Sequence, residues 1–248
     1  MKRSNQTFYE DIHNKYWKSS TDDKEIGSIF SDRICKSKKL ISAENPRRIL
    51  NLGFESIEVA SYIISNMDIE EYILVDIDEN RCKIPKELIE LGYKSINMDI
   101  STEKLPFEDN HFDLVYAGEI IEHLWNPDFA IREIYRVTKE GGTDIITTPN
   151  LASWYNRLLL LTGLTPINVE LSSEAIVGRR FKFLGNGSPP VGHIRVFTKQ
   201  ALLELCGKQG IVKFSLQGYK RGDVRMDGLF SKLPSLASGF ILKITKSH

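Results

Sequence analysis

Three features are scarce in this sequence: cysteines, long hydrophobic runs and an excess of charge of one sign. The three cysteines, Cys35, Cys82 and Cys206, are widely spaced and form no Cys-x-x-Cys pair. This spacing argues against a disulfide framework and a cysteine-ligated zinc site, and it fits a reducing compartment. The longest aliphatic run, residues 158–161, is far too short to span a bilayer, and no apolar segment follows the polar N-terminus. We therefore expect a cytoplasmic protein with no membrane span.

The charges balance, since 33 lysines and arginines face 33 acidic residues. A chain with no overall positive field does not attract nucleic acid or an anionic membrane as a whole, so any such role must come from a local patch. We expect no nucleic-acid partner. With 248 residues, of which 41% are hydrophobic, the chain can form one sizeable core. The sequence leaves the oligomeric state open.

What the sequence does contain is a short apolar run, residues 48–52, that ends at Gly53. Apolar residues at helical spacing follow it: Ile57, Ala60, Ile63 and Ile64. The pattern predicts a strand, a tight turn and a helix. A glycine at the end of a buried strand lets a ligand approach the backbone, and the N–H groups at the helix start attract anions. The turn is therefore a candidate nucleotide cradle, although an ordinary strand-to-helix connection shows the same pattern.

Strands and helices alternate through the middle of the chain. Further strands are expected at 71–76, 94–99, 112–116 and 143–148, and helices at 79–91, ended by Gly92, and after Asn126-Pro127. Such alternation predicts an α/β fold with a doubly wound, Rossmann-like parallel sheet that binds its ligand at the carboxyl ends of the strands.

Both ends of the chain depart from this rhythm. Residues 1–20 carry clustered aromatics, with Phe8, Ile12 and Tyr16 on one helical face, and predict either a lid or a helix packed on the domain. The next expected helix, 26–41, carries a basic cluster that includes Arg33, which we assign to a solvated face.

Beyond residue 150 we expect a helix at 153–161, a long irregular loop at 162–192, and a helix from the Thr198 cap to Lys208, ended by Gly210. Strands are expected at 211–217 and 240–245, joined by an apolar hairpin loop around 229–234. Long loops of this kind commonly act as functional lids.

Two acids recur at a regular interval, because Gly53 precedes Asp76 by 23 residues and Asp76 precedes Asp99 by the same distance. A carboxylate that ends the second strand can accept the hydroxyl protons of a ribose. An acid one strand further on can accept from the amine of an adenine. The alternative for each is a polar residue that caps a strand end.

Several segments together resemble the successive motifs of class I S-adenosylmethionine-dependent methyltransferases, in the branch that includes quinone-biosynthesis enzymes and many small-molecule and glycan methyltransferases. The resemblance covers roughly residues 45–150, and a further segment at 193–203 also resembles that branch. The segments are Ile49-Leu50-Asn51-Leu52-Gly53, Val75-Asp76-Ile77-Asp78, Asn97-Met98-Asp99-Ile100, 105–115, Glu119-Ile120-Ile121-Glu122-His123-Leu124, 131–137 and Lys139-Glu140-Gly141-Gly142.

The resemblance implies S-adenosylmethionine as the cofactor and a seven-stranded sheet, mostly parallel, whose last strand is antiparallel. It implies that Gly53 lies under the methionine part, Asp76 holds the ribose, and Asp99 with Ile100 flanks the adenine. Asn51 and Ile77 are further candidate cofactor-binding residues. Glu119 would begin the loop beside the methyl group, as a cofactor-binding and catalytic residue. His123 is our candidate base for an acceptor that carries a proton.

The first motif departs from the family pattern, which usually has an acid at the position of Asn51 and glycines at those of Glu55 and Ile57. Glu55 would bring negative charge near the methionine carboxylate, and Ile57 would obstruct close approach to the backbone. This departure keeps open a binding module that has the fold but does not bind the cofactor.

A third interpretation starts from Glu119, Glu122 and His123, which share one helical face, together with His193. This set resembles the metal ligands of small-RNA 2'-O-methyltransferases, and carboxylates with imidazoles suit a divalent cation. Metal-free members of the small-molecule branch also carry Glu-Ile-Ile-Glu-His, and the balanced charge gives no RNA footprint. Our prediction for the site therefore contains no metal.

We predict a single domain made of an N-terminal helical lid (1–44), a cofactor-binding core (45–150), a substrate-lid insertion (151–192) and the C-terminal part of the sheet (193–248). The acceptor is expected to be a small molecule, a glycan or a lipid-linked molecule, bound by basic and aromatic side chains. A solvated basic loop with buried aromatics is the alternative. The candidate acceptor-binding residues are Tyr16, Trp17, Tyr155, Arg179, Arg180, His193 and Arg195.

Overall fold

The computed structural model describes residues 23–53, 57–80, 82–83, 89, 93–221 and 225–247. Several expectations fall elsewhere in the chain: the helix at 1–20 with Tyr16 and Trp17, the Glu55 side chain, the Ile57 side chain, most of the helix at 79–91, and Gly92. These expectations stay predictions.

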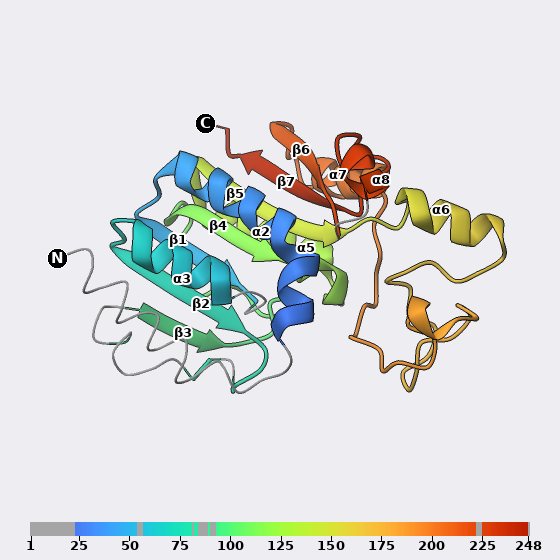
Figure 1. Ribbon diagram of the computed structural model, residues 1–248. Helices are drawn as coiled ribbons and strands as arrows, with labels where there is room; N and C mark the ends of the chain where they lie inside the picture. The colour runs from blue at the N-terminus through green and yellow to red at the C-terminus, as the bar shows by residue number, and fades with distance from the viewer. Residues whose placement is uncertain are drawn as a thin grey trace.

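A seven-stranded sheet forms the centre of the described structure (Figure 1). Its strand order is β3-β2-β1-β4-β5-β7-β6, in which β1 to β5 pair in parallel and β7 is antiparallel to both of its neighbours. The predicted α/β sheet with an antiparallel last strand is confirmed. The strands are β1 (Arg48–Leu52), β2 (Glu71–Asp76), β3 (Tyr93–Asn97), β4 (Phe112–Gly118), β5 (Thr138–Pro149), β6 (Phe214–Tyr219) and β7 (Gly239–Thr245).

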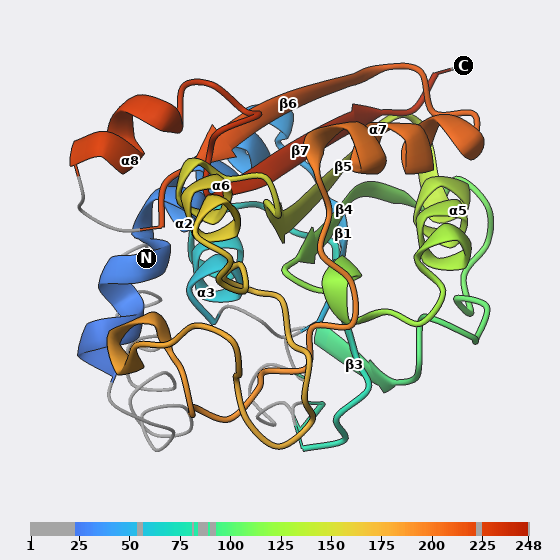
Figure 2. The same cartoon turned by 90° about the vertical axis from the view of Figure 1, so that its right-hand side faces the viewer.

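Helices cover both faces of this sheet because its central strands are apolar on both sides. On one face α2 (Asp23–Glu44) and α3 (Ile57–Asn66) pack on alternate strand residues such as Ile49 and Leu114. On the other face, α5 (Pro127–Val137) and α7 (Lys199–Lys208) pack on the intervening residues, such as Leu50 and Val115 (Figures 1 and 2). The remaining helices are η2 (Ile121–His123), α6 (Trp154–Leu161), η3 (Lys182–Leu184) and α8 (Arg225–Phe230).

The helix boundaries follow local chemistry that the sequence shows. Asn126 caps α5 by accepting the Phe129 N–H at 3.1 Å, and Pro127 follows at the first helical position, where no N–H is needed. Thr198 caps α7 in the same way, through the Ala201 N–H at 3.2 Å. Gly210, at a φ of 80°, lies just beyond the end of α7. The Thr198 cap, the Gly210 stop and a helix after Asn126-Pro127 are as predicted.

Other expectations were wrong in detail. β5 runs through Gly141 and Gly142 instead of starting after them, because Thr138 already pairs with Phe112 of β4, and backbone hydrogen bonds join both glycines to Lys246, just after β7. The hairpin loop expected at 229–234 begins as the short helix α8. Arg33 is not solvated: its side chain is 1% exposed, on the α2 face that also buries Ile34.

Among the described residues, no helix combines the length and the apolar character that crossing a bilayer requires.

Candidate active site

The turn after β1 lies at the carboxyl edge of the sheet, beside the loop that follows β4. Gly53 has a φ of +76°, which L side chains rarely adopt, and its N–H donates to the Val75 carbonyl at 2.7 Å. A Cβ built on Gly53 would lie 2.7 Å from Cδ1 of Ile120. Glycine is therefore favoured by the backbone geometry, and a larger residue would also require the Ile120 side chain to shift.

Asn51 is further from the edge than its predicted role needs. Its side chain is buried on the α2–α3 face of the sheet, where its amide donates to the Tyr72 hydroxyl at 2.7 Å. This hydrogen bond lies inside the protein and not at a ligand site, because Tyr72 itself belongs to the hydrophobic core. The structure thus gives Asn51 a position in the sheet interior, and its predicted contact with the cofactor stays a prediction.

The acids after β2 and β3 both accept from their own turns. Asp76 Oδ1 accepts the Asp78 N–H at 2.8 Å, while Ile77, between them, is 70% exposed. Asp99 Oδ1 accepts the Ser101 N–H at 2.8 Å, and its Oδ2 accepts from the Thr102 hydroxyl at 3.1 Å. A carboxylate oxygen has more than one acceptor direction, so capping and ligand binding are compatible.

Ile100 belongs to the main hydrophobic core and is nearly fully buried. Asp99, its neighbour, is half-buried at the carboxyl edge. In the predicted adenine site, Asp99 would therefore supply a polar edge, and Ile100 would belong to the apolar floor.

Glu119, directly after β4, turns its carboxylate into the protein. Its Oε1 accepts from the Thr147 hydroxyl at 2.9 Å and from the Tyr219 hydroxyl at 3.1 Å, and it lies 3.9 Å from Nε of Arg33. Burial, and the negative charge of Glu119, raise the pKa of Tyr219 well above its usual value, so this hydroxyl stays protonated and donates. Glu119 thus joins α2, β5 and β6, with its own backbone at a φ of +49°.

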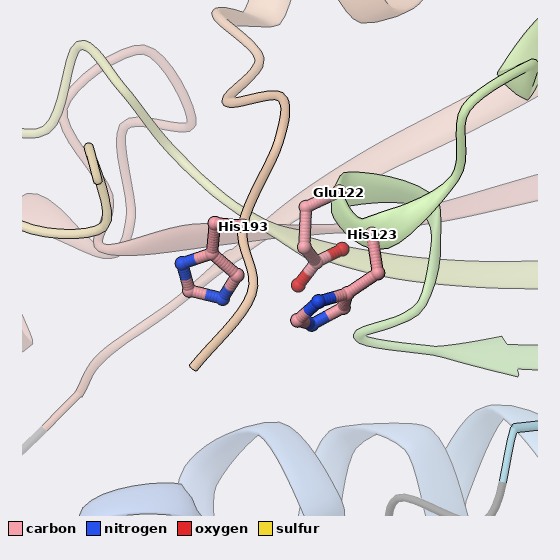
Figure 3. Close-up of side chains that lie close together, drawn as sticks. All are labelled: Glu122, His123 and His193. Carbon is pink, nitrogen blue, oxygen red and sulfur yellow. The ribbon is translucent and has the colours of Figure 1, made fainter. Parts of the chain in front are cut away.

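Three residues further on, Glu122 and His123 meet His193 (Figure 3). One ligand atom from each residue lies within 4.8 Å of the other two, and the two imidazole rings are 4.9 Å apart between centroids. The Glu122 side chain is 1% exposed and accepts from the Thr148 hydroxyl at 3.0 Å. Its backbone carbonyl accepts the N–H groups of Ile194 and Arg195, both at 3.0 Å, which brings the 193–195 segment to this position.

Both histidines have a defined tautomer when neutral. Nδ1 of His123 lies 2.9 Å from the Gly192 carbonyl, and Nδ1 of His193 lies 3.2 Å from the Asn168 carbonyl. Because a carbonyl only accepts, each Nδ1 carries a proton, and the lone pair of each neutral ring is on Nε2. Burial, and the nearby His123, lower the pKa of His193 below its usual 6.5. With a lone pair on each Nε2, the two neutral rings can accept a proton or bind a cation.

Glu170 fixes the segment that carries His193. Its carboxylate accepts three successive backbone N–H groups, from Val191 at 3.0 Å, Gly192 at 2.8 Å and His193 at 3.0 Å. A carboxylate that satisfies consecutive N–H groups holds a loop in one conformation. Sequence reasoning missed Glu170, because nothing local distinguishes it from a solvated acid.

Of the predicted acceptor-binding residues, Arg179 and Arg195 are engaged with the protein backbone. Arg179 is buried and donates to the carbonyls of Leu184, Pro166 and Val169, each at 3.2 Å, so it holds the 162–192 loop together. Arg195 donates to the carbonyl of Leu124 at 3.0 Å and to that of Trp125 at 2.7 Å. Both arginines position the loops beside the histidine pair.

The other two described candidates differ in exposure. Arg180 is exposed, and its guanidinium lies 5.7 Å from the centre of the Phe181 ring. The Tyr155 hydroxyl is buried and has no hydrogen-bond partner among the described residues. A buried hydroxyl without a partner is costly, so Tyr155 is a polar group that a ligand can satisfy.

The structure therefore separates two sets of predicted residues. It gathers Glu122, His123 and His193, whereas Glu119, the fourth member of the proposed metal set, is held by Arg33, Thr147 and Tyr219. Sequence reasoning missed the burial of Arg33, whose one local signal is that it precedes Ile34, on the helical face that also carries Ile41.

Comparison with known proteins agrees with this geometry. Residues 50–146 match the model of a methyltransferase domain family. The ubiquinone/menaquinone biosynthesis C-methyltransferases UbiE of Pseudomonas entomophila and Pseudomonas putida are each 33% identical to this chain over 118 residues. That alignment covers 46% of this chain and 40% of each relative, so it spans well under half of their length.

Solved structures share the fold at low sequence identity. A Thermotoga maritima S-adenosylmethionine-dependent methyltransferase, described as a possible histamine N-methyltransferase, has a TM-score of 0.58 and 16% identity, covering 96% of this chain and 100% of that chain. The [4+2]-cyclase SpnF also has a TM-score of 0.58 and 16% identity, covering 99% of this chain and 96% of that one. Residues 50–146 are therefore similar to a methyltransferase domain family, and the chain has the fold of solved S-adenosylmethionine-dependent methyltransferases.

Proposed function

We propose that the protein transfers a methyl group from S-adenosylmethionine to a small-molecule acceptor. The observation that carries this proposal is the glycine turn after β1 together with Asp76 at the end of β2, both inside the segment that matches the methyltransferase family. In open α/β sheets, ligands bind outside the carboxyl ends of the strands, where the strand order reverses. Here that point lies between β1 and β4.

The described residues fit the cofactor. Gly53 leaves the backbone accessible at the turn, Asp76 offers a carboxylate to the ribose, and the exposed Ile77 offers an apolar surface to a ring. Glu119 would act indirectly, because its contacts to Arg33 and Tyr219 fix the loop that leads from β4 to His123. When bound, S-adenosylmethionine supplies an electrophilic methyl group on sulfur.

His123 is the proposed base for an acceptor that carries a proton. Its Nδ1 proton is committed to the Gly192 carbonyl, so Nε2 accepts the new proton. His193 is the neighbouring imidazole and, with its lowered pKa, remains neutral at pH 7. The remaining contribution of the protein is alignment, since methyl transfer requires the nucleophile, the methyl carbon and the sulfur in line.

For the acceptor we propose a compact ring compound or an amphiphilic molecule, including the glycan and lipid-linked classes. The similarity to UbiE, a ubiquinone/menaquinone biosynthesis C-methyltransferase, supports an aromatic or quinone ring. The unpartnered Tyr155 hydroxyl and the exposed Arg180 support polar groups on that ring. Carbon, oxygen or nitrogen can each serve as the nucleophile at this site.

Calorimetric titration with S-adenosylmethionine and S-adenosylhomocysteine tests the proposal. We expect Asp76→Ala to weaken binding about 10- to 100-fold, since a hydrogen bond to a charged group contributes roughly 1.5–3 kcal/mol. Asp68→Ala is the matched control, because Asp68 is an exposed carboxylate just before β2, at the opposite end of that strand. No binding by folded wild-type protein would contradict the proposal and favour a fold that binds another ligand, as the cyclase with the same fold makes conceivable.

Glu122, His123 and His193 favour a second candidate, cation-assisted methyl transfer. Two imidazoles with defined tautomers and one buried carboxylate form a typical divalent-cation set, although Glu119 does not join it. Titration with Mn²⁺ and with Zn²⁺ would show binding that His193→Gln weakens at least ten-fold and that the control His111→Gln, at the amino end of β4, leaves unchanged. RNA oligonucleotides should then be tested as acceptors only if that cation binds.

A further inference from the structure

The helices α6 and α8 together expose apolar side chains that no other described part of the protein covers. Six large residues are between 50% and 83% exposed. They are Leu158, Leu160 and Leu161 of α6, Met226 and Leu229 of α8, and Leu233 just after it. We call these residues and their immediate neighbours the α6–α8 surface. Exposed apolar groups that cluster in this way mark an interaction site.

The two helices pack against each other, so their exposed residues belong to one surface. The rings of Trp154 in α6 and Phe230 in α8 are stacked, with centroids 5.5 Å apart. Nε1 of Trp154 donates to Asp227 Oδ1 at 3.1 Å, and Arg157 donates to the Ser235 carbonyl at 3.2 Å. Leu158 and Leu161 are four and seven residues after Trp154, on the same side of α6.

This surface has positive charge and no exposed carboxylate. Within the described residues 151–169 and 226–238, Asp227 is the sole acid, and it is 4% exposed. Its oxygens accept from Trp154, from the Ser238 hydroxyl and from the Arg221 N–H. The cationic residues of these two segments, Arg157 and Lys232, are both exposed.

We propose that the α6–α8 surface docks the protein onto an anionic lipid bilayer. Leucines and a methionine on short helices, flanked by lysine and arginine, match the two layers of a membrane interface, where acyl chains lie beneath negatively charged headgroups. A second copy of the chain fits less well, because a symmetric contact would place the same cations opposite one another without carboxylates to pair with them. The balanced net charge of the whole chain does not oppose docking, since the patch is local.

The location of the surface connects it with the proposed site. α6 begins at Trp154, a few residues after β5 ends at Pro149, and Figure 1 shows it projecting beyond the carboxyl ends of the parallel strands. Figure 2 shows α6 and α8 on the same side of the molecule as the 162–192 loop. Docking would therefore bring that loop to the membrane, and an acceptor with a lipid tail could enter from it; this last step rests on the proposed function.

Co-sedimentation of the full chain with vesicles tests the proposal. We expect binding to vesicles of phosphatidylcholine mixed with phosphatidylglycerol, weaker binding to phosphatidylcholine alone, and a decrease with salt. Leu161→Ser/Leu229→Ser should lose binding at least ten-fold. The matched control is Val212→Ser/Ile89→Ser, which removes similarly exposed aliphatic side chains elsewhere. Lys232→Gln should weaken binding about five-fold and Lys199→Gln, at the start of α7, should not.

Equal binding by the leucine variant and its control would overturn the proposal, as would no binding to anionic vesicles by the folded wild type. A concentration-dependent dimer in sedimentation velocity that only the leucine variant loses, without vesicle binding, would assign the surface to a second copy instead. None of these measurements needs the cofactor, so failure here is distinguishable from failure of methyl transfer.

Discussion

The two halves of the carboxyl edge are held in different ways. On the side of β1 to β3, Asp76 and Asp99 accept hydrogen bonds from residues two or three positions further along the chain. On the side of β4 and β5, Glu119 contacts Thr147, Tyr219 and Arg33, which are 28, 100 and 86 positions away. The half proposed for the cofactor is thus organised by local turns, and the half proposed for the acceptor depends on the assembled fold.

This difference implies that mutations should act differently in the two halves. In the half organised by local turns, a substitution should weaken ligand binding more than it lowers the stability of the fold. In the other half, a substitution should destabilise several elements together, because one side chain joins them.

The largest effect is expected for Arg33→Met. Removing this buried guanidinium leaves Glu119 without its cation, and breaking a buried ion pair typically costs about 3 kcal/mol or more of unfolding free energy. Urea denaturation measures the loss. Lys39→Met, an exposed position on the same helix, should change stability by less than about 0.5 kcal/mol. Adding Glu119→Gln to Arg33→Met should restore part of the loss, and an additive double variant would show that the pair is not coupled.

Gly53→Ala should have an intermediate effect, on stability and on cofactor binding together. Its positive φ costs about 1 kcal/mol in alanine, and the contact with Ile120 adds to this. Gly163→Ala isolates the backbone cost, because Gly163 has a φ of +74° and no atom within 4 Å of a built Cβ. Denaturation and calorimetry on both variants should show the larger stability loss, and the only loss of cofactor affinity, in Gly53→Ala. Similar results for both would contradict a close approach at Gly53.

The smallest effect is a change in pH dependence for His193→Gln. The folded protein binds the His193 proton more weakly than the unfolded chain, so stability rises with pH and is lost as pH falls below 6.5. We expect the wild type to lose up to about 1 kcal/mol more than His193→Gln over that range. Denaturation midpoints collected from pH 7 downward give the comparison. Parallel curves for the two proteins would remove the basis for a neutral His193.

The same difference between local and long-range contacts explains which features could be predicted from the sequence. The fold followed from short-range signals: apolar runs gave the strands, and Asn126, Thr198 and Gly210 gave the helix limits. Asp76 and Asp99 were placed correctly at the edge, because Asp76 ends β2 and Asp99 comes two residues after β3. The orientation of Glu119 could not be predicted, since helical spacing with Glu122 and His123 says nothing about a tyrosine 100 positions later.

The burial of charged side chains was the second feature that the sequence did not predict. Arg33 and Arg179 look like members of basic clusters, and such clusters are usually solvated. Arg33 lies beside Glu119 and donates to the Thr147 hydroxyl at 3.5 Å, and Arg179 donates to three carbonyls of its own loop. The cost of burial decides the outcome only after those partners are in place.

The anchoring of the 162–192 loop affects how the sequence of such a protein can diverge in evolution. One end is fixed by Asn156, which accepts the Ile167 N–H at 2.7 Å, and the other by Glu170, which holds residues 191–193. The closure entropy of a loop grows slowly with length, so the exposed residues between the two anchors, unlike the buried Arg179, can be replaced or the loop lengthened at small cost. Ligand preference can therefore diverge in this loop while the histidine pair keeps its geometry.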